Sequence, residues 1–75
     1  MDKIAIEIGK IISFHRNERG LTQETLADLA NIHRTYVSQI ERGLKYPTIY
    51  VLIQISKDLE VPLSDLIIEL EKKIK

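Results

Sequence analysis

The stretch that decides the fold is residues 22–43, TQETLADLANIHRTYVSQIERG. Thr22 is a good helix N-cap, because its hydroxyl can accept a hydrogen bond from a free backbone N–H of the first turn. A narrow stripe of small and apolar residues then follows over two turns: Leu26, Ala27 and Ala30. Asn31 tolerates the left-handed conformation that ends a helix abruptly, and Ile32 after it can fill the corner before the next helix. The stretch therefore predicts a short helix followed by a sharp turn.

Counted from the N-terminus, this short helix is the second that the sequence predicts, and a third is expected directly after the turn. His33 is a candidate cap for it, Gly43 is the predicted end, and Val37, Ile40 and Leu44 are the predicted inward residues. Two helices can cross this closely only with a small residue at their contact, which Ala27 supplies. Residues 22–43 therefore predict a tight helix-turn-helix.

The outward face of the third helix is polar, and packing does not explain it. Three neighbouring residues on a helix point in three directions, so a core cannot require Arg34, Thr35 and Tyr36 together. The predicted outward set is Arg34, Thr35, Ser38, Gln39 and Arg42. A binding role for this face competes with the simpler interpretation of a solvated helix surface.

The flanking segments complete an all-α domain spanning residues 1–75. Apolar spacing predicts helices at about residues 3–18, at 48–59 behind the cap Thr48, and at 62–74 behind Pro62. Their predicted inward residues are Ile4, Ile8, Ile11, Ile12 and His15, then Ile49, Leu52, Ile55 and Leu59, then Leu63, Leu66, Ile67, Leu70 and Ile74. Charge pairs Glu69 with Lys73 and Glu71 with Lys75 would support the exposed last turns. The prediction is a compact five-helix domain without strands.

Composition argues against an enzyme. The chain of 75 residues has no cysteine, no glycine-rich phosphate loop and no nucleophile beside a base. His15 is better explained as a histidine at the edge of the core with a local hydrogen bond, and His33 as a helix cap, than as metal ligands. We therefore expect no catalytic site, no metal site and no cofactor.

Charge is balanced overall but not locally. Eleven Lys and Arg residues match eleven Asp and Glu residues. Residues 33–46 carry three cationic side chains against Glu41 alone, whereas residues 58–71 carry five acidic ones and no Lys or Arg.

The N-terminus lacks a secretion signal and no apolar run approaches the ~20 residues of a membrane helix, so we expect a cytoplasmic protein.

These motifs resemble the lambda-repressor-like helix-turn-helix family, also called XRE or Cro-like. The stretches RNERGLTQETLA, IERG and VPLSDLI carry the resemblance, which covers almost the full length. The run HRTYVSQIERG and the small size are most similar to controller proteins of restriction-modification systems. The sequence departs from the family pattern where Asn31 and Glu60 replace the usual glycines and where His15 replaces the usual leucine. Glu60 is thus expected to be strained or its turn to be differently shaped, and His15 to contact the fifth helix or a partner.

The resemblance implies a sequence-specific, DNA-binding transcriptional regulator. In a major groove, Arg can make two hydrogen bonds to guanine, so Arg34 is the first candidate for reading bases. The full set expected to contact bases is Arg34, Thr35, Tyr36, Ser38 and Gln39. The set expected to contact phosphates is Gln23, Arg42, Lys45 and Thr48, with ordinary surface charge as the alternative. Arg16 and Glu41 resemble a family ion pair that joins the first helix to the third.

A domain this small contacts few base pairs, so a homodimer on a near-palindromic operator is expected. The resemblance to controller proteins implies that it autoregulates a restriction-modification operon. Apolar residues in excess of one core stripe are the predicted dimer interface: Tyr50, Val51, Leu66, Ile67, Ile68 and Leu70. Double-stranded DNA is the expected partner, with RNA polymerase as a second candidate. The alternative function is a small helical protein-binding adaptor or antitoxin-like module.

Overall fold

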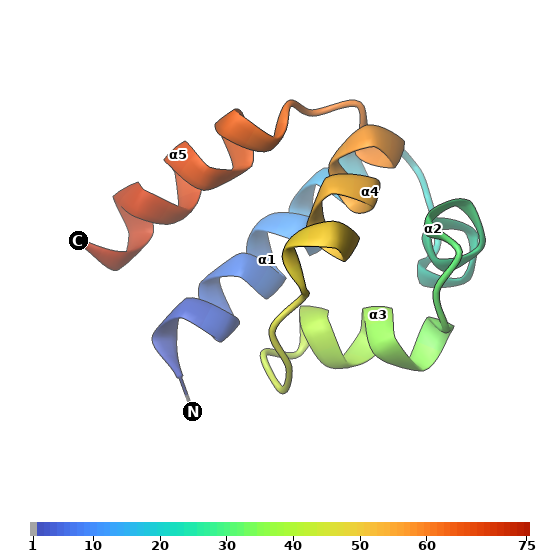
Figure 1. Cartoon of the computed structure of the whole chain (residues 1–75), viewed down its shortest axis with the longest axis horizontal. Coiled ribbons are helices and arrows are strands. Elements are labelled where there is room, and N and C mark those ends of the chain that lie inside the picture. Colours follow the sequence, from blue (N-terminus) through green and yellow to red (C-terminus); the bar gives the residue numbers. More distant parts are fainter. Residues whose placement is uncertain (1) are drawn as a thin grey trace.

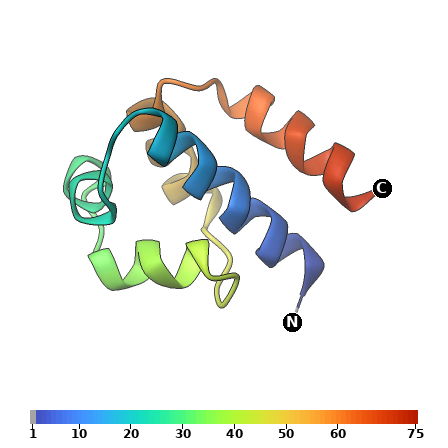
Figure 2. The same ribbon diagram turned by 180° about the vertical axis from the view of Figure 1, so that it is seen from behind.

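A computed structural model describes residues 2–75 and contains five helices. They are α1 (Lys3–Glu18), α2 (Gln23–Ala30), α3 (Arg34–Glu41), α4 (Ile49–Leu59) and α5 (Leu63–Ile74). Figure 1 shows α1 through the middle of the molecule, with α5 beside it and α4 across one face, while α2 and α3 form the opposite end. Seen from behind, α1 lies in front of α4, and α3 again forms an outer edge (Figure 2). The predicted all-α architecture is confirmed.

The helix boundaries follow from local capping. The Thr22 and Thr48 hydroxyls accept hydrogen bonds from the N–H groups of Thr25 (3.0 Å) and Val51 (3.1 Å), as the sequence predicts. Asp2 caps α1 by accepting from the N–H groups of Ile4 and Ala5. His33 occupies the cap position of α3, but its side chain makes no capping hydrogen bond. Side-chain capping therefore fixes the starts of α1, α2 and α4.

The turns between helices use two non-glycine residues at positive φ. Asn31 has φ 57° and ψ 47°, and the Ile32 N–H donates to the Ala27 carbonyl at 3.0 Å, which closes α2 sharply. Glu60 has φ 58° at the end of α4, so the expected strain at this position is present. The predicted turn at Asn31 is confirmed.

The core lies between α1 and the other four helices. Its fully enclosed members come from every helix: Ile12, Leu26, Val37, Ile40, Ile55, Leu59 and Leu66. Three predicted inward residues are wrong, because Ile4 (42% exposed), Leu44 (51%) and Ile49 (64%) lie on the surface. Because α3 ends at Glu41, Leu44 lies beyond the helix. In α4, Val51 and Leu52 belong to the buried face, and Ile49 lies outside it.

The charge pairs predicted within α5 do not form among the described residues. Glu69 instead bonds to α1, with its Oε2 atom 2.8 Å from Nε2 of His15. The predicted contact of His15 with the fifth helix is therefore confirmed, although the bond spans 54 positions and is not local.

No helix within residues 2–75 is long and apolar enough to span a bilayer.

Asp58 gives the fold a pH-dependent weakness. Its Oδ2 atom is buried without a hydrogen-bond partner, and burial raises the pKa of this carboxyl group, against a smaller opposing effect of Lys57. Asp58 also lies in the last turn of α4, where the helix dipole disfavours negative charge. Ionising this side chain therefore costs free energy in the folded state.

We expect Asp58→Asn to stabilise the protein more at pH 7 than at pH 4. Above the unfolded-state value of 3.8, the folded protein holds this proton longer than the unfolded chain. Stability therefore falls as pH rises through the folded-state pKa, and the variant lacks this loss. Urea denaturation at both pH values should therefore show a larger gain in the free energy of unfolding at pH 7 than at pH 4. An equal difference between variant and wild type at both pH values would contradict it.

Candidate nucleic-acid interface

The polar face of α3 is on the surface, at the outer edge of the molecule (Figures 1 and 2). Val37 and Ile40 are completely buried and fix the rotation of the helix about its axis. The opposite side then presents Arg34, Thr35 and Arg42 as exposed residues, with Ser38 and Gln39 half-buried. The side chains that the sequence predicts to point outward therefore share one accessible face.

A shallow hollow of about 260 Å³ runs along this face. It is lined by Gln23, Arg34, Thr35, Ser38, Gln39, Arg42 and Leu44. Four of the five residues expected to contact bases thus lie beside two of the four expected to contact phosphates. Leu44, predicted for the core, is instead part of this surface.

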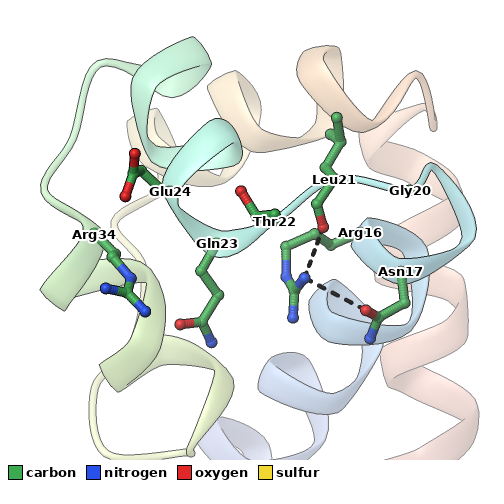
Figure 3. A pocket seen from close by; sticks show the side chains of 8 residues that line it. All are labelled: Arg16, Asn17, Gly20, Leu21, Thr22, Gln23, Glu24 and Arg34. Carbon is green, nitrogen blue, oxygen red and sulfur yellow. Dashed lines mark hydrogen bonds between the residues drawn. The ribbon is translucent and has the colours of Figure 1, made fainter.

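A second hollow of about 660 Å³ lies between the end of α1 and the start of α2. Its lining residues are Arg16, Asn17, Gly20, Leu21, Thr22, Gln23, Glu24 and Arg34 (Figure 3). Gln23 and Arg34 line both hollows, so the two form one continuous surface. The first N–H groups of α2 carry partial positive charge, which suits a phosphate near Gln23.

The pair Arg16 and Glu41 joins α1 to the end of α3 beneath this surface. Nε of Arg16 donates to Oε2 of Glu41 at 2.7 Å, and a terminal guanidinium nitrogen donates to Oε1 at 2.9 Å. Their side chains are only 12% and 6% exposed, and the hydrogen bonds to Glu41 raise the pKa of Arg16 above its usual range. The ion pair implied by the family resemblance is present.

Two further bonds extend this pair into the candidate interface. Arg16 also donates to the Leu21 carbonyl at 2.7 Å, drawn as a dashed line in Figure 3. Gln23 donates from Nε2 to Oε1 of Glu41 at 3.0 Å. No local pattern in the sequence indicates this bond, since its partners lie 18 positions apart. Glu41 therefore orients Gln23 at the start of α2.

Tyr36 lies differently from its neighbours on α3. It is half-buried against the core, and its hydroxyl lies 3.3 Å from both the carbonyl oxygen of Tyr46 and the N–H nitrogen of Thr48. Tyr36 is predicted to contact bases, but its hydroxyl is bonded to the α3–α4 loop. Lys45 and Thr48 are exposed on this loop but line neither hollow.

The residues predicted for the dimer interface are divided between core and surface. Val51 (8% exposed) and Leu66 (0%) belong to the core, so the prediction that they are available to a partner is wrong. Tyr50 and Ile68 are exposed, while Ile67 and Leu70 are half-buried against the core. Two further apolar residues of α4 reach the surface, since Ile49 is exposed and Ile53 is half-buried.

Within residues 2–75, no group of three or more potential metal ligands occurs.

The cationic residues of the α3 face and the following loop are Arg34, Arg42 and Lys45. The nearby Glu41 is already paired with Arg16, whereas Glu24 lies at the rim of the larger hollow. The α3 face therefore suits a polyanion whose own central groups can form hydrogen bonds with the polar side chains of this face.

Comparison with known proteins agrees with this geometry. The helix-turn-helix family matches residues 14–66. The control protein C.SmaI of Serratia marcescens is 36% identical over 53 residues, which are 71% of this chain and 63% of that protein. This chain thus spans less than two thirds of C.SmaI. The control protein C.MunI of Mycoplasma sp is 34% identical over 74 residues, 97% of this chain and 100% of that protein.

A solved structure shows the same likeness over the whole fold. The crystal structure of the restriction-modification controller protein C.Esp1396I superimposes with a TM-score of 0.87 at 38% identity. The match covers 99% of this chain and 95% of that one. This chain therefore belongs to the helix-turn-helix family, in its lambda-repressor-like (XRE) branch, and is similar in sequence and structure to restriction-modification control proteins.

Proposed function

We propose that this protein is a sequence-specific DNA-binding transcriptional regulator that controls the operon of a restriction-modification system. The observation that carries the proposal is the continuous surface on which Gln23 and Arg34 join the two hollows. Its centre offers side chains that bond to base edges, and its rim offers N–H groups and cations for phosphates. The protein would act in the cytoplasm, with no catalytic role, and RNA polymerase is a second proposed partner.

Arg34 would read one base pair, and Thr35, Ser38 and Gln39 would contact neighbouring bases. Gln23 and Arg42 would bind phosphates on the two sides of this group, because they line the same hollow as Arg34. Lys45 and Thr48 would reach the backbone from the following loop. The similarity to the control proteins C.SmaI and C.MunI supports this assignment of function.

A homodimer on a near-palindromic operator is part of the proposal. The surface proposed for the partner copy is the outer side of α4, where Ile49, Tyr50 and Ile53 follow helical spacing. A hollow of about 560 Å³ continues it between Ile53 and Leu63. Ile67, Ile68 and Leu70 stay in the proposal as α5 contributors, whereas Val51 and Leu66 support the surface from within.

The decisive experiment is selection of bound sites from random duplex DNA with the purified protein. A two-fold symmetric motif is expected, because a symmetric dimer places two copies of α3 on one side of the duplex. The affinity for the selected site should also fall steeply as salt rises, through release of counterions. Enrichment of no sequence would favour the alternative of a protein-binding adaptor or antitoxin-like module.

We expect Arg34→Ala to remove the preference at one base position in each half-site. A bidentate contact with guanine contributes about 1–3 kcal/mol of discrimination, so the selected motif should become degenerate there. Competition binding against duplexes with single substitutions measures this loss. Lys72→Ala is the control. Lys72 is exposed on α5, lies far along the sequence from the residues of the candidate interface, and lines neither hollow. A variant that keeps the full preference at every position would contradict the role of Arg34.

A further inference from the structure

The loop between α3 and α4 is held mainly by its backbone. It leaves α3 through Gly43 at φ 76°, and the Leu44 N–H donates to the Gln39 carbonyl at 2.9 Å. The side chains of Leu44, Lys45 and Tyr46 are all exposed, but Tyr46 anchors the loop to the start of α1 through a hydrogen bond with Asp2, which raises the pKa of Tyr46. Beyond the Tyr46 side chain, the position of the far end of the loop depends on the bonds made near Pro47.

The Tyr36 hydroxyl makes two such bonds. It donates to the Tyr46 carbonyl and accepts from the Thr48 N–H, both at 3.3 Å, and so joins the residues on the two sides of Pro47. Proline has no N–H of its own, so this segment cannot make the corresponding backbone bond. The Tyr36 ring is packed against the core, which fixes the hydroxyl relative to α3.

We propose that the Tyr36 hydroxyl is a positioning group that sets where the α3–α4 loop lies relative to the DNA-reading face of α3. This inference rests on the proposed DNA-binding function. Of the candidate phosphate contacts of the loop, Lys45 directly precedes Tyr46, whose carbonyl accepts one bond, and Thr48 itself donates the other. Holding them in register with Arg34 lets base and phosphate contacts form together, at no further ordering cost for the loop.

This role differs from a direct contact between the hydroxyl and DNA. The one phenolic proton is used on the Tyr46 carbonyl, and a lone pair accepts from Thr48. A contact in which the hydroxyl donates to a phosphate would have to replace the bond to Tyr46. Both bonds, at 3.3 Å, are longer than the usual O–H···O and N–H···O distances, so each is weak and the loop can adjust to the DNA backbone.

A double-mutant cycle separates the two roles. Tyr36→Phe keeps the ring and should weaken operator binding about 3- to 10-fold, as for loss of ordinary hydrogen bonds, without changing the selected motif. Lys45→Gln removes one phosphate contact and should lower the salt slope by about one unit. If the hydroxyl acts through the loop, Lys45→Gln costs clearly less in the Tyr36→Phe background than in the wild type. Losses that simply multiply would overturn the inference, because independent sites are additive in free energy.

Amide hydrogen exchange on the free protein tests the same link without DNA. Tyr36→Phe should speed exchange of the Thr48 N–H, while the amides of Val37 and Ile40 within α3 keep their wild-type rates. Lys72→Gln is the charge-matched control for Lys45→Gln and should leave operator affinity and Thr48 exchange unchanged. An unchanged exchange rate of the Thr48 N–H in Tyr36→Phe would overturn this inference and leave the proposed function standing. A wild-type protein without sequence preference would overturn the proposed function and, with it, this inference.

Discussion

Glu41→Ala should lower the free energy of unfolding by about 3–5 kcal/mol, the usual cost of removing one partner from a buried ion pair. The substitution leaves the Arg16 guanidinium, 12% exposed, without the carboxylate that accepts two of its hydrogen bonds. It also removes the acceptor of Gln23. A domain of 75 residues has a total stability of only about 4–11 kcal/mol, so this is a large fraction.

Urea denaturation followed by circular dichroism measures this loss, with Arg19→Ala as the control. Arg19 and Glu60 are 2.8 Å apart, but their side chains are 38% and 69% exposed, so breaking this pair should cost less than about 1 kcal/mol. Similar losses in the two variants would contradict the special role of the buried pair. Glu41→Gln keeps a hydrogen-bond acceptor and should fall between wild type and Glu41→Ala.

The parts of the fold that local chemistry determines could be predicted from the sequence. Thr22, Asn31 and Thr48 are residues whose side chain or backbone preference marks a helix end, and all three do so in the structure. The exposure of Arg34 and Thr35 followed from the positions of Val37 and Ile40 on the same short helix. Such inferences need only the geometry of one helix and its caps.

The orientation of α4 could not be predicted in the same way. Residues 49–53, IYVLI, are apolar almost without interruption, so helical spacing does not show which face is buried. Packing against neighbouring helices buries Val51 and Leu52 and leaves Ile49 and Tyr50 exposed. The assignment of Val51 to a partner surface and of Ile49 to the core was therefore reversed.

Among the bonds between distant segments, the pair of Arg16 and Glu41 followed from the family resemblance, but several other partners could not be predicted. Spacing along a helix predicted a pair of Glu69 with Lys73, but the arrangement of α1 and α5 places His15 beside Glu69 instead. The same holds within the candidate site, where Glu41 holds Gln23 and the Tyr36 hydroxyl holds the loop. These partners are set by tertiary packing, which no local pattern encodes.

Gly9→Ala is the substitution for which sequence and structure predict opposite results. In an isolated helix, alanine is more stable than glycine by about 0.8–1.0 kcal/mol, so the change would stabilise α1. In the fold, Gly9 is buried where α1 meets the end of α3. A Cβ atom there would clash with the Ile40 carbonyl oxygen and would lie 2.9 Å from that of Glu41. Both are backbone atoms, which cannot rotate away as a flexible side chain can.

We therefore expect Gly9→Ala to destabilise the protein by about 2 kcal/mol or more, because overpacking exceeds the gain in helix propensity. Separating α1 from α3 would also disturb the pair of Arg16 and Glu41, so operator affinity should fall together with stability. Urea denaturation measures the first effect, and Gly20→Asn is the control. Gly20 has φ 70° with nothing within 4 Å of an added Cβ, and Asn tolerates this conformation, so its cost should stay below about 1 kcal/mol. If Gly9→Ala were as stable as wild type or more so, α1 and α3 could not lie in direct backbone contact, and the placement of α3 would have to be revised.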